Sequence, residues 1–224
     1  MGQREGRVMR DYTHWIAGGE FSFASIARRC AVSGIILNHV AQGASHHIAA
    51  ALAAAHYAAR EFLAVECRAA WLKPWAALME REQARLARIE MRETGVCYSM
   101  AQAEMSRTAL LINQAACKII DMDAPGVWAL VLDETCTLSV AMAAILAGLT
   151  AGRAIVVAMT DAVPCTLLEA ARLTTEAAFP DGWLNIVTGV TTKAIRALQN
   201  NQVFNRYDRQ SRVIRFQPFL VGST

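Results

Sequence analysis

Three runs of apolar residues in the second half of the chain dominate its hydrophobic pattern. The runs are Val127–Leu132, Ala154–Ala158 and Leu184–Gly189, and the first ends abruptly at Asp133 and Glu134. Short runs of consecutive apolar residues, rich in Val, Ile and Leu, are typical of strands that are buried on both faces. They predict three internal strands of one sheet.

Helix-like segments separate these three runs. Leu138–Thr150 is rich in Ala, Leu and Met and is followed by Gly152, as in a helix with a glycine just past its end. Pro164 stands where the first turn of a second helix would begin, and that helix is expected to continue to Ala177, before a turn at 180–182. Strands joined by connections of helix length predict parallel crossovers.

The first half of the chain is expected to be mainly helical. A glycine turn at 14–21 predicts a short hairpin, and residues 24–43 are expected to be irregular, with strand character only at 33–40. Alanine-rich and amphipathic patterns then predict three helices, at Ser45–Arg60, Cys67–Thr94 and Tyr98–Ile120.

The second of these helices, Cys67–Thr94, carries many arginines and glutamates. Their alternation with apolar residues predicts a solvated face with short-range ion pairs rather than a catalytic cluster of carboxylates. Pro74 is expected to split off the first turn of this helix, because proline cannot donate the backbone hydrogen bond.

Together these elements predict an α/β fold in which a helical amino-terminal part precedes a truncated Rossmann-like parallel sheet. The whole of 1–224 is expected to form one domain, with 1–120 mainly helical and 121–224 supplying the strand–helix–strand part. A helix at Thr191–Asn200 and a fourth strand at Val213–Val221, interrupted by Pro218, are expected to follow the third strand.

Composition narrows the class of protein. Hydrophobic residues make up 54% and charged residues 18% of the chain, which argues against disorder, and a net charge of +3 from scattered basic residues does not indicate nucleic-acid binding. The polar amino terminus lacks the apolar core of a signal peptide. Six widely spaced cysteines are expected to be reduced, mostly buried thiols of a cytoplasmic protein.

Two features have a second interpretation. Thr135–Gly152 is uncharged and about as long as the shortest membrane spans, but its place between two strand-like runs favours a buried crossover helix. His46 and His47 suggest metal ligation, but adjacent helical residues point in different directions. A capping or surface role is favoured for them, and no metal site is predicted.

The chemistry of such a fold is expected at one edge of its sheet. Ligands of parallel sheets bind at the carboxyl ends of the strands, beside helix amino termini that favour anions. The segments to examine are therefore Asp133–Thr137, Met159–Pro164, Gly189–Thr192 and Gly222–Thr224.

A family resemblance emerges over Gly126–Gly189. The run Gly-Val-Trp-Ala-Leu-Val-Leu, the helix before Gly152, Pro164, and Phe-Pro-Asp-Gly-Trp-Leu-Asn-Ile-Val-Thr-Gly at 179–189 follow one another in a familiar order and spacing. This stretch resembles the coenzyme-binding domain of aldehyde dehydrogenases, a family of oxidoreductases. The Asp-Glu pair after the first strand is similar to the degenerate second unit of the tandem, two-unit aldehyde dehydrogenases of family sixteen.

Departures from the family pattern fall at its functional positions. Where the family has Pro-Trp-Asn-Phe-Pro, whose Asn helps to hold the substrate oxyanion, this chain has Asp133–Thr137, with Thr135 in place of the Asn. Where the family has Lys-Pro-Ser-Glu, which contacts the adenosine ribose, this chain has Ala158–Asp161. The resemblance therefore implies that Asp161 is the remaining ribose acceptor.

The resemblance also implies weak coenzyme binding and no catalytic residue. Candidate contacts for NAD or NADP are Asp161, Gly189, Gly222 and Ser223, and the last two resemble the glycine turn that opens the coenzyme-facing helix of the family. The nucleophilic Cys and the general base of the family lie beyond the position matched by Thr224. Covalent aldehyde oxidation needs an activated nucleophile, a base and an oxyanion donor placed together.

These departures lead to two functional hypotheses. The first is a catalytically silent, aldehyde-dehydrogenase-like interaction subunit whose partner is a full-length aldehyde dehydrogenase or another protein. The second is a fragment or split half of an NAD(P)-dependent aldehyde oxidoreductase. The family arm that builds the oligomer is reduced here to Asp121–Pro125, so the usual dimer or tetramer is not assumed.

Overall fold

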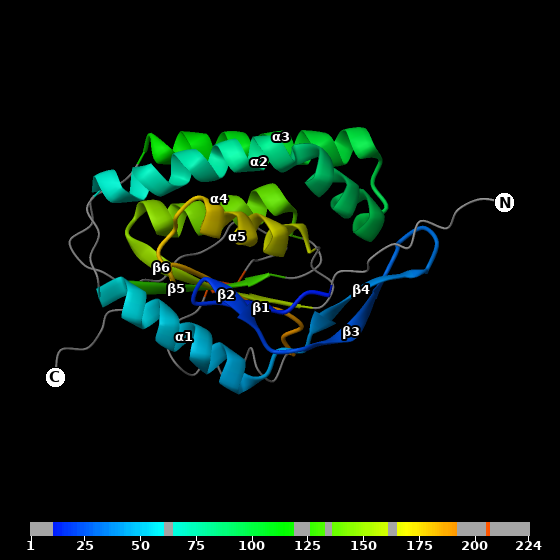
Figure 1. Ribbon diagram of the computed structural model, residues 1–224, viewed down its shortest axis with the longest axis horizontal. Helices are drawn as coiled ribbons and strands as arrows, with labels where there is room; N and C mark the ends of the chain where they lie inside the picture. The colour runs from blue at the N-terminus through cyan, green and yellow to red at the C-terminus, as the bar shows by residue number, and fades with distance from the viewer. Residues whose placement is uncertain are drawn as a thin grey trace.

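The fold is a layered α/β arrangement built around one sheet. The computed structural model describes residues 11–60, 65–118, 126–132, 136–160, 165–191 and 205–206. Helix α1 (Ser45–Arg60) lies on one face of the sheet and α4 (Leu138–Thr150) and α5 (Thr166–Glu176) lie on the other, as Figure 1 shows. An outer layer of α2 (Val65–Thr94) and α3 (Tyr98–Ala116) covers α4 and α5. The predicted α/β class is confirmed.

The sheet contains six strands in the order β2-β1-β7-β6-β5-β8. The six strands are β1 (His14–Ile16), β2 (Gly19–Phe21), β5 (Gly126–Leu132), β6 (Arg153–Met159), β7 (Leu184–Val187) and β8 (Asn205–Arg206). Strands β8, β5, β6 and β7 are parallel, whereas β1 pairs antiparallel with β7 and with β2. The predicted hairpin at 14–21 is therefore formed, and it joins the same sheet as the parallel strands.

The central strands are buried on both faces, as their sequence predicts. Along β5, Leu130 and Leu132 belong to the apolar cluster beneath α4 and α5, while Val127, Ala129 and Val131 belong to the cluster beneath α1. Helices α4 and α5 connect β5 to β6 and β6 to β7, so both predicted parallel crossovers are confirmed. The interpretation of 135–152 as a crossover helix is confirmed at α4.

Three details of the amino-terminal part differ from expectation. Residues 24–43 are not irregular, because β3 (Ala24–Arg29) and β4 (Ile36–Ala41) form an antiparallel hairpin. Helix α3 ends at Ala116 instead of Ile120. Helix α2 runs without a break through Pro74, since Leu72 and Trp75 on either side are buried beneath it, and this packing outweighs the lost backbone hydrogen bond.

One short strand was not predicted from the sequence. Asn205–Arg206 forms strand β8 beside Leu130 and Val131 of β5. The helix start at Pro164, the helix at Thr191–Asn200 and the strand at Val213–Val221 lie outside the described residues, apart from Thr191 itself.

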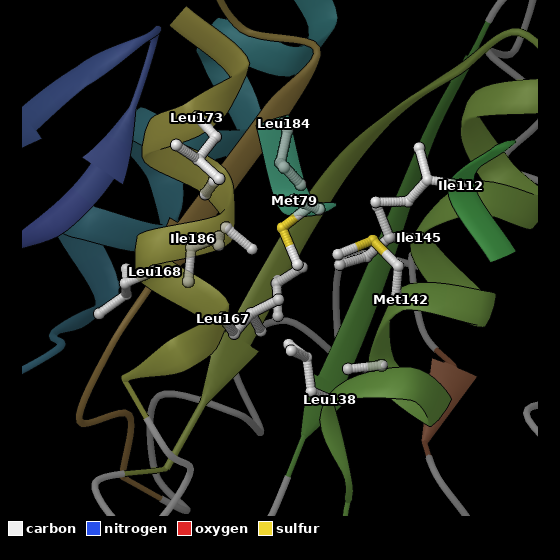
Figure 2. Packing of buried hydrophobic residues seen from close by; sticks show 14 of the residues in the cluster. Met79, Ile112, Leu138, Met142, Ile145, Leu167, Leu168, Leu173, Leu184 and Ile186 are labelled. Atoms are coloured by element: carbon white, nitrogen blue, oxygen red, sulfur yellow. The ribbon is translucent and has the colours of Figure 1, made fainter. Parts of the chain in front are cut away.

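The main core joins the outer helices to the sheet through Met79 of α2. Figure 2 shows Met79 between Leu167 of α5 on one side and Met142 of α4 on the other, with Ile145 and Ile112 beside Met142. Nearby, Nε1 of the fully buried Trp75 donates a hydrogen bond of 2.9 Å to the carbonyl of Ala170 in α5. These contacts with α2 therefore fix the position of α5. Because α5 connects β6 to β7, they also fix the end of β6 and the start of β7.

Shortening Met79 tests this packing. We expect Met79→Ala to lower the free energy of unfolding by about 2–5 kcal/mol, because a fully buried side chain leaves a cavity that the helices cannot close. Leu110→Ala is the control, since this side chain is 53% exposed, and it is expected to cost under about 1 kcal/mol. Equal losses in chemical denaturation would contradict the central position of Met79.

Candidate functional site

The carboxyl edge of the parallel strands is closed by backbone hydrogen bonds. The N–H of Thr160, just after β6, donates to the carbonyl of Leu132 at 3.2 Å, and the N–H of Val190, just after β7, donates to Met159 at 3.0 Å. A residue that follows β6 thus holds the end of β5, and a residue that follows β7 holds the end of β6. The geometry fixes where helices α4 and α5 begin relative to this edge.

The amino terminus of α4 is capped by a carboxylate from another helix. Thr137, the residue before α4, makes no capping hydrogen bond with its own side chain. Instead, the N–H of Ser139 donates to Oε1 of Glu104 in α3 at 2.7 Å. The other oxygen of Glu104 accepts a hydrogen bond of 3.1 Å from Arg107. A fixed negative charge therefore stands at the positive end of this helix.

The amino terminus of α5 has the same arrangement with two carboxylates of α2. The N–H of Cys165 donates to Oε2 of Glu93 at 2.6 Å, and the hydroxyl of Thr166 donates to Oε2 of Glu90 at 2.6 Å. Glu93 also accepts a 3.0 Å hydrogen bond from Nδ2 of Asn38 in β4, and Arg28 of β3 lies 3.8 Å from it. Glu93 thus ties three elements together at the sheet edge.

The electrostatics of this edge are dominated by its buried carboxylates. Burial raises the pKa of Glu90, and the neighbouring charges of Glu93 and Glu104 raise it further. Helix amino termini commonly bind anionic ligands such as phosphate. Here the donors of Ser139 and Cys165 are already used by the protein's own carboxylates. A phosphate at either helix would meet like charge as well as occupied donors.

Neither cysteine close to this edge is an activated nucleophile. Cys136 is buried and its Sγ donates weakly to the carbonyl of Thr137 at 3.7 Å. Cys165 is also buried, and burial, followed by the charge of Glu93, raises the pKa of its thiol well above the ordinary value. Reactive cysteines need the thiolate, so both side chains are suited to packing rather than to attack.

The prediction that the cysteines are mostly buried is wrong for two of them. Cys97 and Cys117 are exposed, at the two ends of α3 in the outer helical layer, and Cys30 is half-buried. Hydrogen bonds from Ser99 and from nearby backbone N–H groups lower the pKa of the Cys97 thiol. None of these five described cysteines forms a disulfide.

Gly189, one of the predicted coenzyme contacts, is held tightly by the chain itself. It is buried, its φ is +60°, and a Cβ there would lie 2.5 Å from the carbonyl oxygen of Ala41. Its own carbonyl accepts a 3.1 Å hydrogen bond from the N–H of Gly43. This close approach of the loop before α1 is sufficient to require glycine. Its contact with a coenzyme remains a prediction.

The other predicted site residues lie outside the described part of the chain. These are Asp161, Gly222 and Ser223, together with Asp133, Glu134 and Thr135. Their proposed contacts with NAD or NADP also remain predictions. Among the described residues, no group of three or more His, Cys, Asp or Glu side chains is arranged to hold a metal ion. In the same part of the chain, no helix is long and apolar enough to cross a membrane.

A buried histidine pair lies on the α1 side of the same edge. Nε2 of His14 in β1 is 3.0 Å from Nδ1 of His47 in α1, and Nδ1 of His14 is 3.0 Å from the hydroxyl of Thr188. His47 Nδ1 also accepts the N–H of Ala44 at 3.1 Å, so the predicted capping role is confirmed for His47. The alternative surface role is wrong for it, because the side chain is buried.

Sequence reasoning missed these carboxylates because it assigned the charges of α2 to a solvated face. Glu93 follows the fully buried Met79 and Leu86 at intervals of seven residues, so it continues the buried stripe of the helix. Glu90 is also buried, so the solvated-face interpretation is wrong for both. It holds for exposed pairs such as Arg81 with Glu176, although that pair joins two helices instead of neighbouring turns.

Comparison with known proteins identifies the fold. The model of the aldehyde dehydrogenase family matches residues 15–138 and 126–206. Similar solved structures are a Burkholderia cenocepacia protein assigned to the aldehyde dehydrogenases (26% identity, TM-score 0.77), the NAD-dependent aldehyde dehydrogenase of Sinorhizobium meliloti (22%, 0.79) and the salicylaldehyde dehydrogenase of Pseudomonas putida G7 (19%, 0.74). No curated protein sequence matches the chain.

These alignments cover most of this chain but less than half of each relative. They include 83%, 88% and 84% of this chain, and 44%, 45% and 43% of the Burkholderia, Sinorhizobium and Pseudomonas chains respectively. The two relatives below 25% identity show the fold alone. The family matched is the one that the residues at 126–189 resemble.

Replacing Glu93 tests the carboxylate cap of α5. In Glu93→Gln the amide retains one acceptor, but its NH₂ group must face either the N–H of Cys165 or the Nδ2 of Asn38. We expect a loss of about 2–3 kcal/mol in the free energy of unfolding, because one buried donor is left without an acceptor. Glu176→Gln is the control, since its pair with Arg81 is exposed, and it should leave the denaturation midpoint nearly unchanged. A tolerated Glu93→Gln would contradict the cap.

Proposed function

Because this chain belongs to the aldehyde dehydrogenase family, we propose that it keeps the scaffold of the coenzyme-binding domain but does not oxidise aldehydes by itself. It acts, in this proposal, as an interaction subunit for another protein. The observation that carries the proposal is the occupation of the α4 and α5 amino termini by Glu104 and Glu93. Ligands of such sheets bind at this edge, but here these helix N–H groups already donate to the protein's own carboxylates.

The described residues at the sheet edge also favour the absence of aldehyde oxidation in this proposal. The thiols of Cys136 and Cys165 are buried, and burial raises the pKa of Cys165, which disfavours a thiolate. In the sequence, Thr135 replaces the family's oxyanion-holding Asn. A threonine side chain is shorter, so its hydroxyl cannot take the position of the amide N–H without a shift of the backbone. Chemistry would therefore have to come from outside this segment.

Coenzyme binding is expected to be weak for the same reasons. The Sinorhizobium relative is NAD-dependent. In this chain the family's Lys and Glu after the second strand are replaced, which leaves Asp161 as the ribose acceptor and removes a cation. In the family these two residues contact the adenosine ribose, and charge-assisted hydrogen bonds are the stronger ones, so their replacement weakens the contact with that ribose. We therefore expect NAD or NADP to bind weakly, with Asp161, Gly189, Gly222 and Ser223 as the proposed contacts.

The partner proposed for this subunit is a full-length aldehyde dehydrogenase or another protein chain. The edge strand β2 carries Phe21, and Phe23 directly after it is 90% exposed. Exposed apolar side chains beside an open sheet edge favour contact with a second polypeptide. The charge of the chain is small, so neither nucleic acid nor an anionic membrane surface is the proposed partner.

A second candidate function follows from the length of the relatives. The Burkholderia chain is more than twice as long as the part that this chain matches, since only 44% of it is covered. The segment is then one part of an NAD(P)-dependent aldehyde oxidoreductase, completed by a catalytic part on the same or another polypeptide. A Cys-bearing catalytic sequence encoded directly downstream of Thr224 would favour this candidate over the silent subunit.

Activity of the isolated chain is the direct test. With NAD⁺ or NADP⁺ and a panel of aliphatic and aromatic aldehydes, we expect no NADH or NADPH above the protein-free control. A complete aldehyde dehydrogenase in the same assay controls for the substrates. Turnover at an enzyme-like rate of about 1 s⁻¹ or more would overturn the proposal. Calorimetric titration with NAD⁺ should give a dissociation constant weaker than millimolar.

A further inference from the structure

The His14–His47 pair is built from hydrogen bonds in which ring nitrogens accept from backbone and imidazole N–H groups. Nδ1 of His47 accepts from two donors, the N–H of Ala44 at 3.1 Å and Nε2 of His14 at 3.0 Å. On the other side of the pair, Nδ1 of His14 accepts from the N–H of Thr188 at 3.2 Å. His14 must therefore carry its proton on Nε2, and His47 must carry its proton on the nitrogen that faces away.

Protonation would turn these acceptors into donors. A proton on Nδ1 of His47 would face two N–H groups at once. A proton on Nδ1 of His14 could be accepted by the Thr188 hydroxyl at 3.0 Å, but the N–H of Thr188 would lose its acceptor. His14 is completely buried and His47 is 8% exposed, so water cannot replace the lost acceptors unless the site opens. A charge on the pair is thus opposed by its burial and by the two donors that face Nδ1 of His47.

Three segments are joined at this point of the fold. His14 lies in β1, His47 lies in the first turn of α1, and Thr188 follows β7. The hydroxyl of Thr188 donates to the carbonyl of Ala41 at 2.8 Å. The N–H of Gly43 donates to Gly189, next to Thr188. Breaking the histidine pair would therefore release the loop at 41–44 from the turn at 188–190.

No described carboxylate lies close enough to compensate a charged imidazole. His46 is the nearest titratable neighbour, with its ring centroid 3.9 Å from that of His47, and Phe21 of β2 contacts the other side. Glu20 of β2 points to the opposite face, where it binds Arg172 at 2.7 Å.

The remaining charged groups on the adjoining elements are either paired with another residue or far from His47. On β4, His39 pairs with Asp11 at 3.1 Å near the surface. His56 and Arg60 lie in the last two turns of α1, at the far end of the helix from His47. An added proton would therefore meet other imidazoles, not a carboxylate.

We propose that the His14–His47 pair is an acid-released latch, which holds the start of α1 and the loop at 41–44 against the Thr188–Gly189 turn at neutral pH. Protonation opens this corner of the sheet edge while the remaining core stays folded. The latch is independent of whether the chain binds a coenzyme or a partner. It rests only on the geometry of the pair and its burial.

The pKa values agree with this direction. Burial, followed by the neighbouring His47 and His46, lowers the pKa of His14 to about 4, and burial also lowers that of His47. A free imidazole has a pKa of about 6.5, so the opened site binds more protons than the closed one. The closed site is therefore most stable above about pH 6.5 and loses stability as the pH falls towards 4.

Native-state hydrogen exchange at pH 7 and pH 5 tests the latch. After correction for intrinsic rates, the opening equilibrium at the amides of Gly43, Ala44 and Thr188 should rise by about twentyfold or more at pH 5, which is the proton linkage of one imidazole. The amide of Val156 in β6 is fully buried and reports global opening. At pH 5 a low concentration of denaturant should speed exchange at Val156 and leave exchange at the three amides nearly unchanged, because a local opening exposes little surface. Equal denaturant dependence at all four amides, or an opening equilibrium at the three amides that does not rise at pH 5, would overturn the proposal.

His47→Asn and His39→Asn are the matched variants. In His47→Asn the amide oxygen can accept from Ala44 and His14 but does not titrate, so the pH effect at the three amides should be smaller than in the wild type. His39→Asn, on the exposed pair with Asp11, should match the wild type. If the pH effect in His47→Asn equals that of the wild type, the latch is not at this pair.

Should His47→Asn fail to fold, NMR of the wild-type imidazoles decides the question. Both rings of the pair are expected to be neutral at pH 6. A protonated His14 at that pH, with the amides of Gly43 and Thr188 still protected, would overturn the latch.

Discussion

Buried helix amino termini need hydrogen-bond acceptors, and this need ties the outer helices of the protein to its sheet. The first N–H groups of α4 and α5 lie inside the molecule, and neither helix has a side-chain cap of its own. Glu104 of α3 and Glu93 of α2 supply the acceptors. Because a buried carboxylate without donors would be equally unfavourable, the two layers fix each other.

The same need for acceptors affects the edge of the sheet where a ligand would bind. In parallel α/β sheets, ligands are bound where strand ends meet helix starts, and those donors are commonly free to meet an anion. Here Ser139 and Cys165 give their N–H groups to the protein's own carboxylates, and the loop before α1 presses on Gly189. The fold is therefore kept by interactions that engage N–H groups at the starts of both crossover helices. The neutral histidine pair beside Thr188 extends this internal closure to the α1 side.

Much of the fold was predictable from the sequence because its signals are local. The strands at Val127, Ala154 and Leu184 are consecutive apolar runs, and the helix between the first two ends just before Gly152. The β3–β4 hairpin and the burial of Glu93 were not predictable in the same way. The sequence Ala-Ser-Ile-Ala-Arg-Arg has weak strand propensity, so β3 depends on its pairing with β4. Glu93 lies at the same seven-residue spacing as the buried Met79 and Leu86. Because glutamate is charged, it was nevertheless predicted to lie on a solvated face.

The central claim is that carboxylates of the outer helices occupy the anion positions at the starts of α4 and α5. An experimental structure at high resolution, from crystals grown in millimolar NAD⁺, tests it directly. The account predicts that oxygens of Glu104 and Glu93 remain within hydrogen-bonding distance of the Ser139 and Cys165 N–H groups, without a phosphate at either helix. A coenzyme phosphate bound to one of these N–H groups, with its glutamate displaced, would contradict the account.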